Sequence, residues 1–241
     1  MKVRIVVKEK VDLSGKIFLT GFRSNIGETG YIAVSRIVES EGARKIGFID
    51  SEYLPPSAFM GDDGILMPYE LYVLEDLVVF FSRVQPSRLE WNSLMREISS
   101  WVSKEKMKEA VIIGGLDSEF QEDDNDKLRI SATKRFLVEH PDVKYRLMEG
   151  GLGMYGPLAL LLTYFEMMDF PAVAILPYAE RGRPDPRAAA VALEAINELY
   201  GYKLNTESLL RDAEEIEKQI ELLMKHQREV RETGGKSDMF I

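Results

Sequence analysis

The sequence contains no cysteine and only two histidines, His140 and His226. Without cysteine the chain forms no disulfide and offers no thiolate to zinc, to an iron–sulfur cluster or to nucleophilic catalysis. Neither histidine has a neighbouring side chain at metal-ligand spacing, which leaves little material for a histidine-based metal site or a catalytic triad. We therefore predict no metal, no cofactor and no catalytic residues.

An excess of positive charge and a long apolar run are also lacking. Lysine and arginine number 31 against 40 acidic residues, a net charge of −9. That sign repels phosphate backbones, so we expect no nucleic-acid partner. The first ten residues, MKVRIVVKEK, carry charges through their apolar stretch, which is typical of neither a signal peptide nor a membrane span. We expect no membrane association and a cytoplasmic location.

The 241 residues instead alternate short β-rich runs with helical patterns. Predicted strands cover Lys16–Phe22, Lys45–Ile49, Leu77–Ser82, Ala110–Ile113, Val143–Met148 and Ala172–Leu176, with hairpin material around Pro68. Predicted helices cover Gly27–Glu41, Arg88–Lys104, Leu158–Met168 and Arg187–Tyr200. This alternation favours right-handed crossovers and an α/β fold whose mostly parallel sheet is covered on both faces.

A last, long helix is predicted over residues 205–232, with Asn205 or Thr206 as its N-cap. Its apolar residues form a narrow row that includes Ile216, Ile220 and Leu223, as in a helix that packs on another helix or subunit. We therefore divide the chain into an α/β domain at 1–204, this helix, and a linker with a tail at 233–241. The row predicts a homo-oligomer.

The acidic stretch Glu119–Lys127 has two interpretations. Carboxylates are the ligands that calcium prefers, but the glycine and glutamate positions of an EF-hand loop do not occur in frame. We interpret the stretch as a solvated surface loop.

Two glycine-rich loops stand between predicted strands and helices. Gly151-x-Gly153-x-x-Gly156 matches the dinucleotide-binding pattern literally. However, little sheet follows it, and Pro157 removes an N–H from the start of the next helix. We interpret these glycines as structural, letting the chain turn sharply and the helix approach the sheet.

The other loop, Gly21–Gly27 (GFRSNIG), lacks the Lys-Ser/Thr of a P-loop and the Gly-x-Ser-x-Gly of a nucleophile elbow. A tight strand-to-helix turn is the simpler interpretation. Anion binding by Arg23, Ser24 and Asn25 is a second one. The alternative function is thus a small-ligand-binding protein or enzyme that takes a nucleotide, nucleoside or phosphate at residues 21–27 and 150–156.

The sequence finishes with the apolar Met239, Phe240 and Ile241 after a Gly-Gly linker. Exposed tails are usually polar, so an apolar tripeptide with a free carboxylate favours a docking element. It either enters a partner's pocket or packs on its own oligomer. In the second case, partner binding by the intact protein is weak.

The succession of these motifs resembles the proteasome assembly chaperone family, and most closely its archaeal members. The residues that carry the resemblance are Gly21-Phe-Arg-Ser-Asn-Ile-Gly27-Glu-Thr-Gly-Tyr-Ile-Ala33, Gly47-Phe-Ile-Asp-Ser51, Glu149-Gly-Gly-Leu-Gly153-Met-Tyr-Gly-Pro157, Pro171-Ala-Val-Ala-Ile-Leu176, Pro184-Asp-Pro186 and the charged terminal helix. Each motif is unspecific alone, but their order covers about nine-tenths of the chain.

The resemblance implies a three-layer α/β/α sandwich, akin in architecture to nucleoside phosphorylases, without known catalysis. It implies a homo-oligomer, a tetramer or pentamer, that interacts with the proteasome core particle, its α subunits or a paralogous chaperone. Family relatives carry a C-terminal hydrophobic–tyrosine–any motif. Met239 and Ile241 match its outer positions, whereas Phe240 replaces the tyrosine and lacks its hydroxyl.

Overall fold

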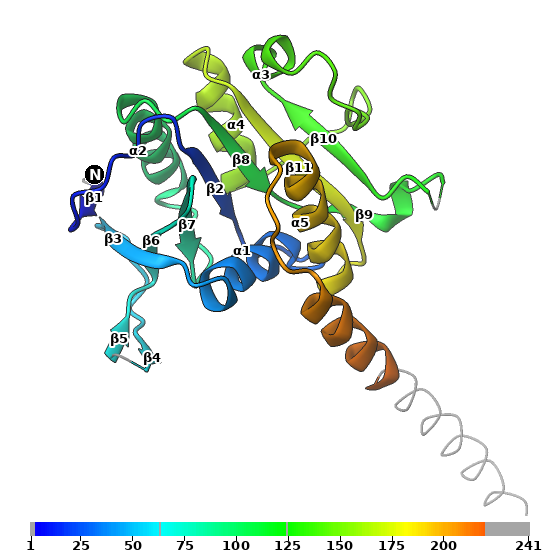
Figure 1. Cartoon of the computed structure of the whole chain (residues 1–241), viewed down its shortest axis with the longest axis horizontal. Helices are drawn as coiled ribbons and strands as arrows, with labels where there is room; N and C mark the ends of the chain where they lie inside the picture. Colours follow the sequence, from blue (N-terminus) through cyan, green and yellow to red (C-terminus); the bar gives the residue numbers. More distant parts are fainter. Residues whose placement is uncertain (1–2, 63, 124, 220–241) are drawn as a thin grey trace, which may run out of the picture.

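The computed structural model describes residues 3–62, 64–123 and 125–219 (Figure 1). A nine-stranded sheet runs in the order β1-β3-β6-β7-β2-β8-β11-β10, with β9 paired to β11. The strands are β1 (Val3–Val7), β2 (Ile17–Gly21), β3 (Arg44–Ser51), β6 (Tyr69–Leu74), β7 (Leu77–Ser82), β8 (Glu109–Ile113), β9 (Leu116–Asp117), β10 (Leu128–Ala132) and β11 (Ala172–Ala179).

The centre of the sheet is parallel. Strands β7, β2, β8 and β11 pair in parallel, and every residue in them is buried. Their sequences are near-continuous apolar runs, as expected where helices cover both faces. Antiparallel strands extend both edges, β6, β3 and β1 on one side and β10 on the other.

Helices cover both faces and complete three layers. α2 (Trp91–Lys104) and α4 (Pro157–Met167) lie on one face, and α1 (Thr29–Ser40) and α5 (Pro186–Tyr200) lie on the other. The alternation of strand side chains separates two cores, because Phe18 faces α2 and α4 while Ile17 and Leu19 face α1 and α5. The predicted α/β sandwich with a parallel core is confirmed.

Short capping signals fix the helix ends. Asp185 accepts a hydrogen bond from the backbone N–H of Ala188 at 3.0 Å, and Pro186 opens α5 behind it. Gly201 ends the helix in the left-handed conformation at φ 73°. The predicted start and end of α5 therefore follow from local chemistry.

The strand predicted over Val143–Met148 is wrong. Its place at the sheet edge is taken by β10, which pairs antiparallel with β11, and only Leu147 forms an isolated bridge to Ile130. The chain between them forms the short α3 (Lys134–Glu139), which Thr133 caps by accepting from Phe136 N–H. A second departure is the hairpin of β4 (Phe59–Gly61) and β5 (Gly64–Leu66), which projects from the sheet (Figure 1).

The helix after α5 begins as predicted. The side chain of Asn205 accepts from the backbone N–H of Glu207 at 2.9 Å, and residues 207–219 are helical within the described part of the chain. Leu209 and Ala213 are buried, Ile216 is half-buried, and the helix then extends away from the sandwich (Figure 1). The division at residues 204, 232 and 233 stays a prediction.

Candidate functional site

The carboxyl ends of β2, β8 and β11 open into a cavity of about 500 Å³, and both glycine-rich loops contribute to its wall. The first loop, residues 21–27, follows β2, and the second, residues 149–156, precedes α4. After β2 the chain continues to β3, on the β7 side of the sheet, and after β8 it continues to strands on the β11 side. The cavity therefore lies where the connections from two neighbouring parallel strands run in opposite directions. Open α/β sheets bind ligands in this crevice. Two loops far apart in the sequence therefore form one site.

The first loop is held by direct backbone contact between β2, α1 and β8. A Cβ atom on Gly30 would lie 2.3 Å from the carbonyl oxygen of Ile113, and one on Gly21 would lie 2.4 Å from that of Gly30. Gly27 has φ +65°, and a Cβ there would also meet Ala179 at 2.6 Å. These glycines bring the start of α1 against the sheet and fix one wall of the cavity.

Arg23 lines the cavity, and its positive charge is neutralised by Glu28. Its Nη1 lies 2.5 Å from Oε2 of Glu28, and its guanidinium covers the ring of Tyr31 at 3.5 Å from the centroid. The hydroxyl of Ser24 donates to the carbonyl of Ile26 at 3.1 Å. An anion held by Arg23 and Ser24 therefore competes with partners inside the chain.

The lining of the cavity includes a second ion pair, between Asp117 and Arg181. Asp117, at the end of β9, is 2% exposed and accepts from Nε of Arg181 and from the backbone N–H of Glu119. The hydrogen bond from Arg181 is the main reason that the pKa of Asp117 lies below its ordinary value. A general acid needs a raised pKa, so this carboxylate serves as an ion-pair partner.

The second loop owes its shape to backbone conformation. Gly151 and Gly156 have φ of +95° and +96°, which confirms the predicted turn. The predicted close approach is wrong at these positions, because a Cβ on Gly153 meets only the side chain of Tyr155, at 3.6 Å or more. The close contacts occur in the first loop instead. A dinucleotide fingerprint also needs a strand directly before its first glycine, and none ends there.

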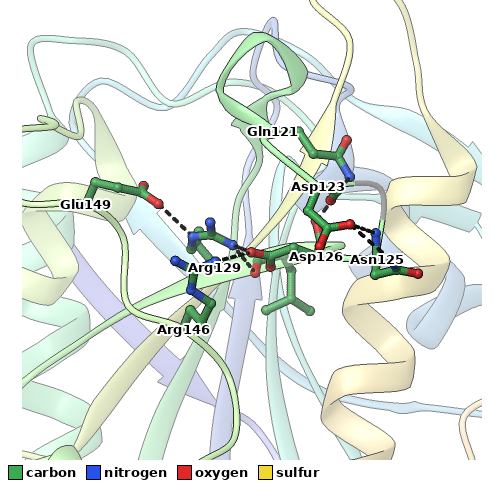
Figure 2. Close-up of polar contacts among 8 residues, drawn as sticks. Gln121, Asp123, Asn125, Asp126, Arg129, Arg146 and Glu149 are labelled. Carbon is green, nitrogen blue, oxygen red and sulfur yellow. Dashed lines mark hydrogen bonds and ion pairs between the residues drawn. The ribbon is translucent and has the colours of Figure 1, made fainter.

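A buried arginine anchors the chain that leads into the second loop, and Figure 2 shows its partners. Arg129 in β10 is fully buried, and its guanidinium pairs with Asp126 and with Glu149, the latter at 2.8 Å. Asp126 also pairs with Arg146 at 3.1 Å. The backbone N–H of Met148 donates to Ile130 in the same strand. The cavity wall at Met148 is thereby tied to the sheet edge.

Sequence reasoning did not single out Arg129. The available signal was an arginine between two apolar residues, Leu128 and Ile130, with an acidic residue three positions earlier. The prediction of a solvated surface loop at Glu119–Lys127 is confirmed for most of its described residues, which are exposed, whereas Asp126 is neutralised by two arginines. Within residues 3–62, 64–123 and 125–219, no group of three or more His, Asp or Glu side chains could hold a metal ion.

The cavity lacks a nucleophile–base pair in the described part of the chain. Its charged lining residues are Arg23, Asp117 and Arg181, and each belongs to an ion pair. His140 lies at the amino-terminal end of the central strands, opposite the cavity, where its Nε2 is 2.8 Å from Oε2 of Glu109 at the start of β8. His226 lies outside the described residues.

Of the predicted interaction residues, Ile216 lies in the described part of the chain, and it does not line this cavity. Ile216 is half-buried on the helix after α5, close to Glu217, which pairs with Arg187 of α5 at 3.0 Å. The other predicted residues, Ile220, Leu223, Met239, Phe240 and Ile241, lie outside the described residues. Among the described helices, none is both long and apolar enough to cross a membrane.

Comparison with known proteins covers nearly the whole chain. An uncharacterized protein of Methanocaldococcus jannaschii is 25% identical over 241 residues, which span 99% of this chain and 98% of that protein. The crystal structure of Pyrococcus furiosus PbaA, an archaeal homolog of proteasome-assembly chaperone, superposes with a TM-score of 0.80 at 21% identity, covering 97% of this chain and 96% of PbaA.

Pyrococcus furiosus PbaB, an archaeal proteasome activator, gives a TM-score of 0.76 at 19% identity, covering 92% of this chain and 98% of PbaB. Both structural matches place the present fold among these proteins. The sequence model of the PAC2 family matches residues 18–224, which contain both glycine-rich loops and almost all of the sandwich. The chain belongs to the PAC2 family.

Proposed function

We propose that this protein is a non-enzymatic, homo-oligomeric chaperone-like protein that interacts with the proteasome core particle, its α subunits or a paralogous chaperone. The observation that carries the proposal is the likeness to PbaA over 97% of the chain, together with PAC2 family membership. PbaB, with the same fold, is an archaeal proteasome activator. The two neighbours thus connect this fold with proteasomes in two ways.

The chemistry of the cavity supports a role without catalysis. Asp117 has a lowered pKa and pairs with Arg181, and Arg23 pairs with Glu28. A catalytic acid or base works best with a pKa near the working pH and a free path to its substrate. These paired groups meet neither condition.

The helix after α5 is the proposed oligomer contact. Its first turns pack on the core through Leu209 and Ala213, so its direction away from the sandwich is fixed. We expect the row of apolar residues that includes Ile216, Ile220 and Leu223 to contact a second helix, and a closed ring of subunits would bury it. Ile220→Asp should shift the native mass of the protein from oligomer to monomer. Glu221→Gln, a neighbouring position off the row, should leave the mass unchanged.

Residues Met239, Phe240 and Ile241 are the proposed docking element. Purified core particle immobilised on beads should capture the full chain, and deletion of the three residues should abolish capture while native mass spectrometry still shows the oligomer. Lys236→Ala, in the preceding linker, is the matched control. Equal capture of the deleted and full chains would refute the docking role.

Phe240→Tyr should strengthen capture by a factor of about two to ten, because it restores one neutral hydrogen bond worth about 0.5–1.5 kcal/mol. Competition titration with the unmodified chain measures this ratio. An unchanged or weaker affinity would mean that the partner pocket makes no use of the hydroxyl.

A further inference from the structure

We propose that the cavity at the carboxyl ends of β2, β8 and β11 binds a small aromatic anion, with the ring in the cavity and a carboxylate or phosphate on the arginines beside it. The interior of the cavity is apolar. Its lining includes Phe22, Ile113, Leu116, Leu158 and Leu176, which come from five different segments. At about 500 Å³ it is within the range that small-molecule sites occupy.

A second, more open hollow of about 550 Å³ adjoins the cavity. The two share Arg23, Ser24, Gln85 and Trp91 in their linings, so they form one continuous depression. The lining of the second hollow contains more charged side chains, because it adds Glu28, Arg88 and Arg183. An occupant that fills both hollows therefore has an apolar part and a polar part.

Trp91 lines both hollows, and a hydrogen bond holds its indole in place. Its Nε1 donates to the carbonyl oxygen of Pro86 at 2.9 Å, and the guanidinium of Arg88 lies over its ring at 5.7 Å from the centroid. An indole held in this way offers a flat surface to a second ring. The guanidinium of Arg88, which lies over the indole, places a cation beside this surface.

The charge of the depression selects an anion. Four arginines line it, Arg23, Arg88, Arg181 and Arg183, against the two carboxylates of Glu28 and Asp117. Three of the arginines have ion-pair partners in Glu28, Asp117 and Glu180. Arg88 makes no ion pair within the described residues.

This local positive excess belongs to a chain with a net charge of −9, so general electrostatics does not account for it. A free guanidinium binds carboxylate and phosphate oxygens in the same two-pronged way. The geometry therefore defines the shared chemistry, a ring with one anionic group, and an experiment separates its two sources.

Two matched probe sets test the proposal. The first is AMP, adenosine and inorganic phosphate, and the second is indole-3-acetate, indole-3-acetamide and acetate. Saturation-transfer NMR detects binding to the full chain, and calorimetry gives the dissociation constants. In at least one set, the probe that carries both ring and anion (AMP or indole-3-acetate) should bind at least tenfold more tightly than the neutral ring or the small anion alone. The set that does so identifies phosphate or carboxylate as the preferred anion.

Two variants locate the site. Gly153→Phe should abolish binding, because Gly153 lines the cavity, has an ordinary φ and has room for a side chain. Gly150→Phe, in the same loop with nothing within 4 Å of its Cβ and outside the lining, should bind normally. Arg88→Gln should weaken binding about tenfold. Arg96→Gln, within α2, should have no effect, although the guanidinium of Arg96 also lies over an aromatic ring, that of Tyr164.

Binding of neither ring-bearing anion at millimolar concentration would overturn the proposal. So would equal binding of the neutral rings, or binding that survives both Arg88→Gln and Gly153→Phe. The thermal midpoint of each variant is measured first, and a variant that fails to fold is replaced by Leu158→Phe, which fills the cavity from α4. None of these outcomes depends on proteasome binding.

Discussion

Residues 21–27 and residues 149–156 wall the same cavity, yet glycine serves a different purpose in each. In the first loop, Gly21 together with Gly30 of α1 allows backbone to touch backbone, with no space for a methyl group. In the second loop, Gly151 and Gly156 supply positive φ, while a Cβ on Gly151 would meet nothing within 4 Å. One wall is therefore set by packing, and the other by turn conformation and a polar anchor.

Among the variants considered, Gly30→Ala should cause the largest loss in the free energy of unfolding. Its Cβ would lie 2.3 Å from the carbonyl oxygen of Ile113, so α1 must shift away from β8. We expect a loss of about 3 kcal/mol in the free energy of unfolding, at the upper end of the overpacking range, despite the better helix propensity of alanine. Urea denaturation measures it. Gly150→Ala is the control, and equal midpoints for the two variants would contradict the packing account.

Arg129→Met tests the anchor of the second wall. The methionine keeps the buried aliphatic stem and leaves Asp126 and Glu149 without their shared cation. These carboxylates are partly exposed and can recover water, so the cost should be about 1–3 kcal/mol, below that of a fully buried broken pair. Arg146→Met removes an exposed cation from the same Asp126 and should cost under about 0.5 kcal/mol. A smaller effect at Arg129 than at Arg146 would refute the anchoring role.

Local sequence patterns predict the central strands and helices around the first loop well. They predict the segment that leads into the second loop poorly. The central strands are long apolar runs, and α5 carries Asp185, Pro186 and Gly201 at its ends, so local patterns specify them. Strand β10 is short and contains Arg129, and the segment Val143–Met148 has a more strand-like pattern. Local pattern does not decide which of the two pairs with β11, because one partner of the buried Arg129, Glu149, is 20 positions away in the sequence.

The cavity itself was only partly predictable. Both glycine loops were singled out as candidate binding elements, but local patterns do not reveal that they face each other, since that depends on strand order. Arg88 and Trp91 gave no signal as site residues, because a helix start with an arginine and an aromatic residue is common. Their significance comes only from the two hollows, both of which Trp91 lines and one of which Arg88 lines.

Arg181→Gln examines the ion pair between Asp117 and Arg181 through its pH dependence. The pKa of Asp117 in the native protein is below its ordinary value of 3.8, mainly because of Arg181. The unfolded chain therefore binds this proton more readily, and the stabilisation is complete above about pH 4 and lost as the pH falls through the lowered pKa. The difference in thermal midpoint between native protein and variant should be largest at pH 6 and shrink toward pH 3. A difference that is constant over this range would show that Asp117 is not linked to Arg181.

A matched variant sharpens that result. Arg183→Gln removes the partner of Glu180, whose side chain is 58% exposed. Exposed pairs contribute little, so the midpoint of this variant should follow that of the native protein from pH 6 to pH 3. A comparable loss would mean that net charge, rather than the buried carboxylate, controls acid stability.

Gly153→Val should have the smallest effect on stability. Although Gly153 is the central glycine of a G-x-G-x-x-G pattern, its φ is in the ordinary range and its Cβ would touch only Tyr155, whose side chain is 93% exposed and free to move. We expect a change in the free energy of unfolding within about 0.5 kcal/mol, as for an unconstrained surface position. Gly156→Ala is the comparison in the same loop, and its φ of +96° should cost about 1–3 kcal/mol. A valine at 153 that destabilises as much as an alanine at 156 would mean that the second loop packs like the first.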